Sequence, residues 1–411
     1  MIEPFPAYHE KIGELRAQLT DRGSLGLIVM DLSPLAALEF EYGSEPYEEV
    51  RQRLFRVFTE QRGRDYRNGD IVALNEPSGL LFLLFLDRKR RQSVPITPSD
   101  LRTVRTRLGS AMVPALARCV FPYFKAPLRI EVGHALALQN PLVEAGRIVR
   151  RAIREAVESA AHYRRMDELA LRERLQDVIV RDRLVTAFQP ILRLSDRGLL
   201  GFEALSRGAR GSGLETADVL FGGAEKHELL LELDRLCRSR ALMHSGRLPS
   251  TAKLFINTLP ATVRDPQFRG RPLITFLDRA QVAPSRIVLE ITEKLVIENY
   301  GLFREAMAYY TDLGVSFAVD DVGAGYSGLE SIASLKPAYL KIDIALVRDV
   351  HVSMVNREMV KAIVAMGRGI GATVIAEGIQ AEEEAKALLG MGVSWGQGYL
   401  LARPEAGPEP S

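Results

Sequence analysis

The sequence predicts an α/β protein in which a smaller mixed α/β domain is followed by a connecting helix and a TIM-like (β/α)8 barrel. Three observations predict this arrangement. From about Thr186 onward, eight short apolar runs alternate with stretches of helical length. Between Pro141 and Arg183, a proline-free stretch interleaves both charge signs, while the segment before it alternates strand-like runs with helical patterns. We therefore expect domains at 1–140 and 175–411, joined by a connector at 141–174.

Composition places the chain among ordinary globular proteins. It has 411 residues, of which 47% are hydrophobic and 26% charged, and its net charge is +2. Neither disorder nor a nucleic-acid partner is expected from these values. The two cysteines, Cys119 and Cys237, have no CxxC spacing, and the first residues show no signal peptide. No apolar run approaches the roughly 18 residues of a membrane span, so we expect a soluble, cytoplasmic protein.

The N-terminal domain is predicted from its alternating elements. The expected strands lie in the apolar runs Leu25 to Leu32, Gly79 to Asp87 and Leu128 to Leu138. Helical periodicity covers Tyr47 to Arg62 and Pro98 to Arg118. The Pro141 to Arg183 stretch that follows has sparse apolar residues at steps of three and four, which predicts a long exposed helix.

The barrel is predicted from repeated strand and helix units. Its eight apolar runs are FQPIL, LLGFEAL, KLFINT, IVLEIT, SFAVDDVG, YLKIDI, TVIAEGI and SWGQGYLL. Stretches of helical length separate most of them, for example Leu302 to Leu313 and Arg357 to Gly369. Units of this kind favour parallel strands closed into a barrel, whose active site lies at the carboxyl ends of the strands.

Polar residues gather at those expected strand ends. Each of them would cost free energy of folding if it faced a dry core. They are Glu203, Asn257, Glu290, Asp320, Asp321, Lys341, Asp343, Glu377 and Gln397. A single residue of this kind is usually a helix cap or a solvated loop residue, but seven consecutive strand ends share the pattern. Converging carboxylates repel unless cations neutralise them, and oxygen ligands favour Mg²⁺ or Mn²⁺ over Zn²⁺.

The sequence lacks the motifs of zinc hydrolases, serine hydrolases and nucleotide-binding proteins. The six histidines show no HExxH spacing, and the chain contains no GxSxG elbow and no P-loop. The glycine-rich GAGYSG follows two aspartates and continues unlike a dinucleotide loop. Adjacent Asp320 and Asp321 suit two cations about 4 Å apart, which activate water and stabilise in-line displacement at phosphorus. The residues therefore favour metal-assisted phosphodiester hydrolysis.

The ordered motifs FQPI, EALSR, FIN, EITE, DDVGAGYSGL, LKID, AEG and GQGYL, from about Leu175 to Pro404, resemble those of EAL-domain cyclic-di-GMP phosphodiesterases. The resemblance implies hydrolysis of cyclic-di-GMP to linear pGpG with two Mg²⁺ or Mn²⁺ ions, in a homodimer formed through this domain. The implied metal ligands are Glu203, Asn257, Glu290 and Asp320 for one ion, and Asp320, Asp321 and Glu377 for the other.

The resemblance also implies roles around the metals. Lys341 would position or help deprotonate the attacking water, and Asp343 would orient that lysine. Glu293 would hold the loop after Asp321, where Gly323 and Gly325 permit a sharp turn. The implied substrate contacts are Gln189, Leu205, Arg207 and Gln397, and an arginine fork suits a phosphate or a guanine edge.

Departures from the family pattern leave an alternative open. Val322, Ala324 and Gly328 replace an aromatic residue, a hydroxyl residue and a serine in the loop that usually reads DDFGTGYSSL. Gln380 replaces the final glutamate of AEGVE, which would weaken the second metal. The alternative is therefore a receptor or signalling adaptor that binds cyclic-di-GMP without turnover. A scaffold without ligand binding is disfavoured, because no metal-ligand position is lost.

The N-terminal domain resembles a degenerate GGDEF domain, the fold of diguanylate cyclases. LIVMDLSPLAALEFEYG and RIEVGHALA are similar to early and late family motifs. The signature hairpin, however, falls on NEPSGL, with Pro77 where flexible glycines would donate backbone N–H groups. Asp31 has no evident second carboxylate. No cyclase activity is expected, and the domain would instead regulate the barrel.

Overall fold

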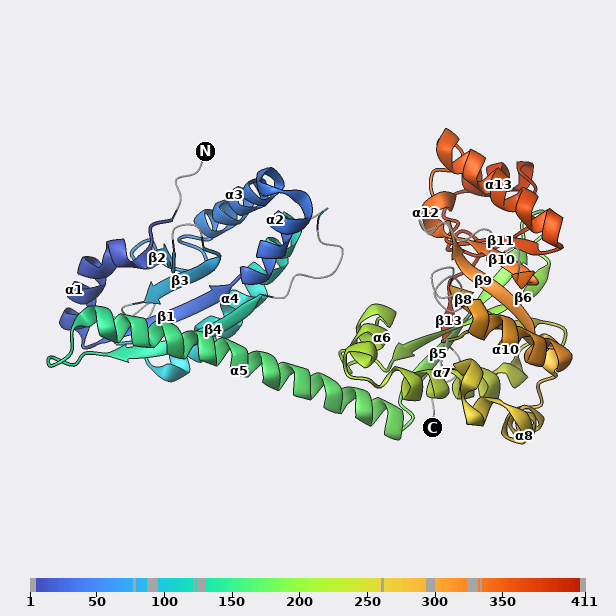
Figure 1. Cartoon of the computed structure of the whole chain (residues 1–411), viewed down its shortest axis with the longest axis horizontal. Helices are drawn as coiled ribbons and strands as arrows, with labels where there is room; N and C mark the ends of the chain where they lie inside the picture. The colour runs from blue at the N-terminus through green and yellow to red at the C-terminus, as the bar shows by residue number, and fades with distance from the viewer. Residues whose placement is uncertain are drawn as a thin grey trace. The chain divides into compact units, whose positions relative to one another are not determined.

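The computed structural model describes residues 5–76, 79–86, 95–120, 123, 130–259, 262–292, 300–323, 332 and 335–406. The chain divides into two compact units, Met1–Ala170 and Leu171–Ser411. Each unit has its own sheet (Figure 1). Each also has its own hydrophobic core.

The first unit is a four-stranded antiparallel sheet with helices on both faces. Its strands are β1 (Ser24–Asp31), β2 (Ile71–Leu74), β3 (Leu81–Leu86) and β4 (Glu131–Leu138), in the order β2-β3-β1-β4. One face packs against α2 (Ala36–Tyr42), α3 (Ser44–Glu60) and α4 (Pro98–Cys119). The other face packs against α1 (Ile12–Arg22) and α5 (Ala145–Val180). Strand alternation assigns each side chain of β1 to one of these two cores.

The three strands and two helices expected here are confirmed, although their ends differ by a few residues. The sequence analysis did not predict α1, α2 or β2. Strand β2 has only four residues, which is too short for an alternation signal. It forms because its residues pair with Phe82 to Phe85 of β3 and are buried on both faces of the sheet.

The expectation of an exposed connector is wrong for the first half of α5 and for its last turns, where Leu175 and Val178 are buried. Ile148, Val149, Ala152, Ala156 and Ala160 of this helix are buried against the sheet. A close approach of the two backbones makes this possible, because a Cβ at Gly133 of β4 would lie 2.0 Å from the Ala156 carbonyl oxygen. The small residues therefore allow the helix to pack where its charge pattern suggested full exposure.

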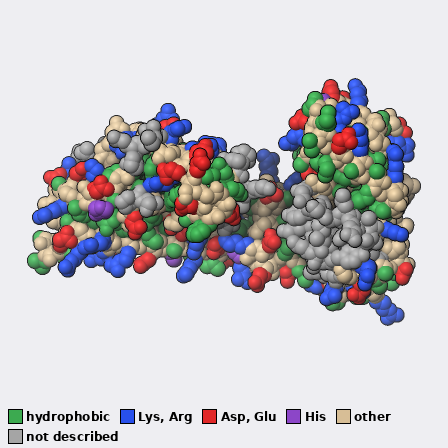
Figure 2. Space-filling model, turned by 45° about the horizontal axis from the view of Figure 1, so that its top comes forward, with side chains coloured by type: hydrophobic (Ala, Val, Ile, Leu, Met, Phe, Trp, Pro, Cys, Tyr) green, Lys and Arg blue, Asp and Glu red, His purple; other side chains and the backbone are tan. Residues whose placement is uncertain are grey.

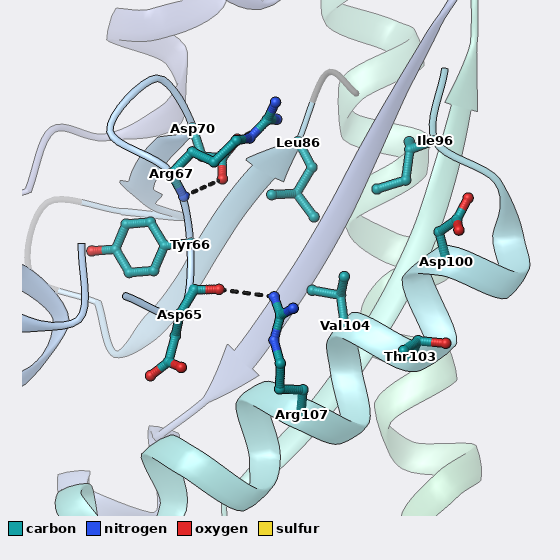
Figure 3. A pocket seen from close by; sticks show the side chains of 10 residues that line it. All are labelled: Asp65, Tyr66, Arg67, Asp70, Leu86, Ile96, Asp100, Thr103, Val104 and Arg107. Atoms are coloured by element: carbon teal, nitrogen blue, oxygen red, sulfur yellow. Dashed lines mark hydrogen bonds and ion pairs between the residues drawn. The ribbon is translucent and has the colours of Figure 1, made fainter. Parts of the chain in front are cut away.

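The connection between α3 and β2 is fixed against α4 (Figure 3). The Asp70 carboxylate accepts hydrogen bonds from the backbone N–H of Arg67 at 2.7 Å and from its Nε at 2.9 Å. Arg107 of α4 donates from Nη2 to the carbonyl oxygen of Asp65 at 2.9 Å. The residues that make these bonds line a cavity of about 210 Å³. They define the start of β2.

The second unit is a closed barrel of eight strands. They are β5 (Leu184–Arg193), β6 (Leu199–Gly208), β7 (Lys253–Asn257), β8 (Ile287–Thr292), β9 (Ser316–Val322), β10 (Tyr339–Ile342), β11 (Thr373–Ala376) and β12 (Trp395–Gly396). Pairing of β12 with β5 closes the barrel, and the short β13 (Glu405–Ala406) adds to β5. All eight expected runs form strands, which confirms the predicted barrel.

Helices surround this barrel (Figure 1). The α-helices bounded by described residues are α6 (Ala217–Lys226), α7 (Leu230–His244), α8 (Gly270–Ala280), α10 (Tyr300–Asp312), α12 (Ile344–Val347), α13 (Met354–Ile370) and α14 (Glu382–Gly390). Their apolar faces bury the outward side chains of the strands, whereas Ile191, Phe255, Val288, Ala318 and Ile375 fill the barrel interior. Polar residues above this layer are therefore confined to the strand ends.

The expectation of all-parallel strands is wrong for β5. This strand runs antiparallel to both β6 and β12, whereas the other adjacent pairs from β6 to β12 are parallel. The reason is the connection after Arg193, which is a tight turn with Arg197 in the left-handed region at φ 62°. A parallel crossover needs about a dozen residues or more, and a hairpin needs only a few.

The surface carries both charge signs. Figure 2 shows Lys and Arg side chains interspersed with Asp and Glu side chains over the visible face. This fits the net charge of +2. In the described part of the chain, no helix has the length and apolarity that crossing a bilayer requires.

Candidate metal centre and catalytic pocket

The barrel mouth collects the predicted carboxylates around one buried lysine. Lys341 Nζ of β10 lies 2.6 Å from Glu377 Oε1, 2.7 Å from Glu290 Oε1, 3.2 Å from Asp320 Oδ1 and 3.3 Å from Glu203 Oε2. The lysine side chain is 0% exposed. These residues lie on β6, β8, β9 and β10 and directly after β11. The ends of five strands thus meet at one point, as the strand-end pattern predicted.

Two overlapping groups of carboxylates could each hold a cation. Glu203, Glu290 and Asp320 form one group, and Asp320, Asp321 and Glu377 form the other, each with one oxygen per residue within 4.8 Å of its neighbours. Asp320 belongs to both groups, and the bridging role that the resemblance implies for it stays a prediction. These five carboxylates and the single ammonium carry a formal charge of −4, which two divalent cations would neutralise. The donor set therefore fits two hard cations.

The pKa values reflect this crowding. Burial raises the pKa of Glu290 and of Glu377 well above the usual range, and neighbouring carboxylates add to the effect. Burial, Asp320 and Asp343 raise the pKa of Asp321 to about 6. Burial alone would lower the pKa of Lys341, but the surrounding carboxylates outweigh it and hold that pKa well above its ordinary value. Lys341 therefore stays an ammonium group at neutral pH.

A local backbone irregularity brings Asp320 and Asp321 to the same side. Consecutive strand residues normally point to opposite faces. Asp321 instead has φ 56°, in the left-handed region that aspartate tolerates better than most residues. The register between β9 and β10 shifts at the same place, where Val319 and Val322 face Leu340 and Ile342, so β9 holds one extra residue there. This bulge re-aims the second carboxylate.

The loop after Asp321 begins with a required glycine. Gly323 has φ 97°, and a Cβ at this position would lie 2.2 Å from Leu346 Cδ1. This agrees with the sharp turn expected there. Gly325, Ala324 and Gly328 lie outside the described residues, as does Glu293, so the roles expected for them stay predictions.

Two amides hold Glu203. Gln397 Nε2 donates to Glu203 Oε2 at 2.5 Å and to Glu377 Oε1 at 2.9 Å, and Asn257 Nδ2 donates to Glu203 Oε1 at 3.2 Å. The buried Oε1 of Gln397 has no hydrogen-bond partner among the described residues. In this structure Gln397 positions two candidate metal ligands, while the substrate contact expected for it stays a prediction.

Asp343 is placed differently from the expectation for it. Its Oδ1 accepts a hydrogen bond from the backbone N–H of Ala345 at 2.7 Å and caps α12. The charge of Asp343 also raises the pKa of Asp321. Within the described residues, the ion pairs of Lys341 run to four other carboxylates, so Asp343 acts on Asp321 rather than on the lysine.

A cavity of about 680 Å³ adjoins the metal centre. Among its lining residues are Glu290, Asp321, Asn257 and two predicted substrate contacts, Leu205 and Arg207. The third, Gln189, is buried on β5 opposite Glu203, and its Nε2 donates to the Ala402 carbonyl oxygen at 3.1 Å. A volume of this size is typical of small-molecule pockets, which span about 300 to 1,000 Å³.

The sequence analysis missed several residues of this cavity, including Ser206, Asp234, Thr258 and Thr292. Asp234 is buried, accepts from Thr262 Oγ1 at 2.6 Å and pairs with Arg238 at 3.1 Å. A charged residue inside an amphipathic helix is usually solvated, so no local pattern marked it. Thr258 and Thr292 could have been found, since each closely follows a predicted strand-end ligand.

Gln380 lies in the loop after Glu377. Its side chain is exposed, and its backbone N–H donates to Glu384 Oε2 at 2.8 Å. Glu384 also accepts from the backbone N–H groups of Ala381 and Asp349, at 3.1 Å each. The loop after Glu377 is thus held by Glu384, and the weaker second metal expected from Gln380 stays a prediction.

Comparison with known proteins identifies this part of the chain. The family model described as "EAL domain" matches residues 172–404. An uncharacterized signaling protein of Caulobacter vibrioides is 28% identical over 264 residues, covering 64% of this chain and 32% of that protein. The cyclic di-GMP phosphodiesterase NbdA of Pseudomonas aeruginosa is 30% identical over 250 residues, covering 59% and 31%. The chain thus spans about a third of the length of these curated relatives.

A solved structure is similar to part of the chain. The "PaMucR Phosphodiesterase, c-di-GMP complex" matches with a TM-score of 0.52 and 26% identity, covering 57% of this chain and 97% of that one. The family match over residues 172–404 covers the barrel. It includes the antiparallel strand β5 and the carboxylates around Lys341. The chain belongs to the EAL domain family.

Proposed function

We propose that the barrel hydrolyses cyclic-di-GMP to linear pGpG with two divalent cations, Mg²⁺ or Mn²⁺. The observation that carries this proposal is the pair of carboxylate groups sharing Asp320 beside a cavity of about 680 Å³. The relative NbdA and the solved PaMucR structure carry the same activity or ligand in their names. When bound, the cations would activate a water molecule and stabilise charge developing on the phosphate.

The residues of this chain have distinct roles in that reaction. Glu203, Asn257, Glu290 and Asp320 would hold one cation, and Asp320, Asp321 and Glu377 the other. Water would attack phosphorus as the bond to the leaving ribose oxygen breaks, and the proton that the water loses would end on that oxygen. Lys341, which lies within 3.3 Å of four of these carboxylates, would position the attacking water or help to deprotonate it. Arg207 and Leu205 would hold the dinucleotide in the cavity.

A metal titration tests this proposal. We expect turnover of cyclic-di-GMP with Mg²⁺ or Mn²⁺, loss with EDTA, and inhibition by Ca²⁺, whose longer bonds suit this chemistry poorly. Gln380→Glu should lower the half-saturating Mg²⁺ concentration by about 10-fold or more, because a nearby carboxylate strengthens metal binding. Turnover that survives EDTA contradicts the metal mechanism. A protein that binds cyclic-di-GMP but is inactive at every metal concentration is instead a receptor.

We also propose that the barrel unit forms a homodimer through α12, α13 and the turn between them. Ile344, Val352, Met354, Val355 and Met359 of this segment are exposed, and Met354 is 78% exposed. Several exposed apolar side chains in one segment are the feature expected of an interaction site. The segment follows Asp343, which acts on Asp321, so a contact here would reach the metal centre.

The dimer proposal has a direct test. M354D/V355D should convert a dimer to a monomer in light scattering at micromolar concentration, because two buried carboxylates would oppose the contact. E358A/K361A, which removes an exposed ion pair from the same helix, is the control and should stay dimeric. A monomeric wild type, or an M354D/V355D variant that remains dimeric, rules this surface out.

For the first unit we propose a degenerate GGDEF domain without cyclase activity. The sheet order β2-β3-β1-β4 places the end of β1, with Asp31, level with Leu81 of β3. Asp31 Oδ1 accepts from the backbone N–H of Ser33, and Pro77 of the altered hairpin lies outside the described residues. Incubation with GTP and Mg²⁺ should give no cyclic-di-GMP, and any detectable synthesis refutes this. We also propose that this unit regulates the barrel through α5. The compartment that we propose for the protein is the cytoplasm.

A further inference from the structure

The first unit contains a second cavity whose lining is basic. It has a volume of about 570 Å³ and is lined by Tyr8, Asn75, Arg147, Arg150, Ile153 and Arg154. The arginines come from the first two turns and the start of the third turn of α5, and Asn75 follows β2. No part of the proposed phosphodiesterase reaction uses this cavity.

The three arginines share one helix face. Positions 147, 150 and 154 are three and four residues apart, so their side chains are neighbours. Like charges at this spacing repel each other, and among the described residues the three arginines have one side-chain ion pair, between Arg150 Nη2 and Glu144 Oε2 at 4.0 Å. Arg147 and Arg154 have no side-chain ion pair or hydrogen bond among the described residues. An anion in the cavity would relieve this repulsion.

The chemistry of the lining indicates the class of anion. A guanidinium presents a planar fork that matches phosphate oxygens in pairs, and three such forks suit more than one phosphate. Asn75 adds an amide donor, and the half-buried Tyr8 adds a ring and a hydroxyl group. A cavity of this size also accommodates a small organic ligand. We propose that this cavity, bounded by α5 and Asn75, binds a small molecule that carries two or more phosphate groups.

Calorimetry on the full chain tests this site. The probes are inorganic tripolyphosphate and ATP, both in EDTA so that no cation attracts phosphates to the barrel. Wild type should bind one equivalent, and R150S/R154S should bind at least tenfold more weakly. The control R151S/R165S removes two exposed arginines of the same helix outside this cavity, and its affinity should change less than twofold.

The outcomes separate the possible sources and sites. Binding of both probes identifies the phosphates as the recognised group, and tighter binding of ATP identifies a nucleotide as the natural source. Equal weakening of R150S/R154S and the control overturns the site, because it reveals only general attraction to a basic helix. Loss of binding in an Arg207→Ala variant also overturns it, because Arg207 lines the barrel cavity and the ligand would then occupy the barrel. Neither result depends on turnover of cyclic-di-GMP.

Discussion

Replacing Glu203 or Asp320 with alanine is expected to reduce cyclic-di-GMP turnover by at least about 100-fold, the lower range for loss of one stabilising group at a reacting centre. Glu203 is held by Gln397 and Asn257 and belongs to the first carboxylate group. Asp320 belongs to both groups, so its loss removes a ligand from each cation. The Asp320→Ala variant should therefore be the less active of the two. Steady-state rates at saturating Mn²⁺ measure the effect.

The fold should survive these substitutions. Each removes one carboxylate from a crowded acidic cluster, so the remaining carboxylates repel one another less. Without metal, the thermal midpoint should be equal to that of wild type or higher. Asp278→Ala, at an exposed position on α8, is the control and should leave both rate and midpoint unchanged. Near-wild-type turnover by either active-site variant would show that the ligand assignment is wrong.

Replacing Lys341 with methionine is expected to lower the free energy of unfolding of the metal-free protein by about 3 to 5 kcal/mol, the range for breaking a buried ion pair. The ammonium group is the positive charge that Glu203, Glu290, Asp320 and Glu377 share, at 2.6 to 3.3 Å. Methionine fills a similar volume without the charge, so the carboxylates are left uncompensated. Turnover should also fall below detection, since the group proposed to act on the attacking water is gone. Urea unfolding in EDTA measures the stability.

Divalent cations provide the control for this result. They would supply the positive charge that Lys341→Met lacks, and a ligand that binds only the folded state stabilises it. Mn²⁺ should therefore raise the thermal midpoint of Lys341→Met by more than that of wild type, without restoring turnover. Lys361→Met, which removes an exposed lysine of α13, should unfold like wild type. A Lys341→Met protein as stable as wild type in EDTA would contradict the central role of the ammonium group.

Much of the barrel could be predicted because its strands are buried. Each expected run from FQPIL to SWGQGYLL became a strand, since contiguous apolar residues between helical stretches have few other folds. The predictions failed where contacts between residues distant in the sequence determine the local structure. Half of α5 is buried because Gly133 lets the helix approach the sheet. Strand β2 forms because β3 pairs with it. No local pattern encodes either contact.

By itself the sequence determined which residues meet at the barrel mouth, because strand ends of a barrel converge whatever the details of packing. Glu203, Glu290, Asp320 and Glu377 could therefore be named in advance. Only the tertiary structure decided how they are arranged. It set β5 antiparallel, turned Asp321 toward Asp320 through a bulge at φ 56°, and surrounded Lys341 with four carboxylates. These features depend on register and packing between strands distant in sequence, which side-chain patterns along one strand do not specify.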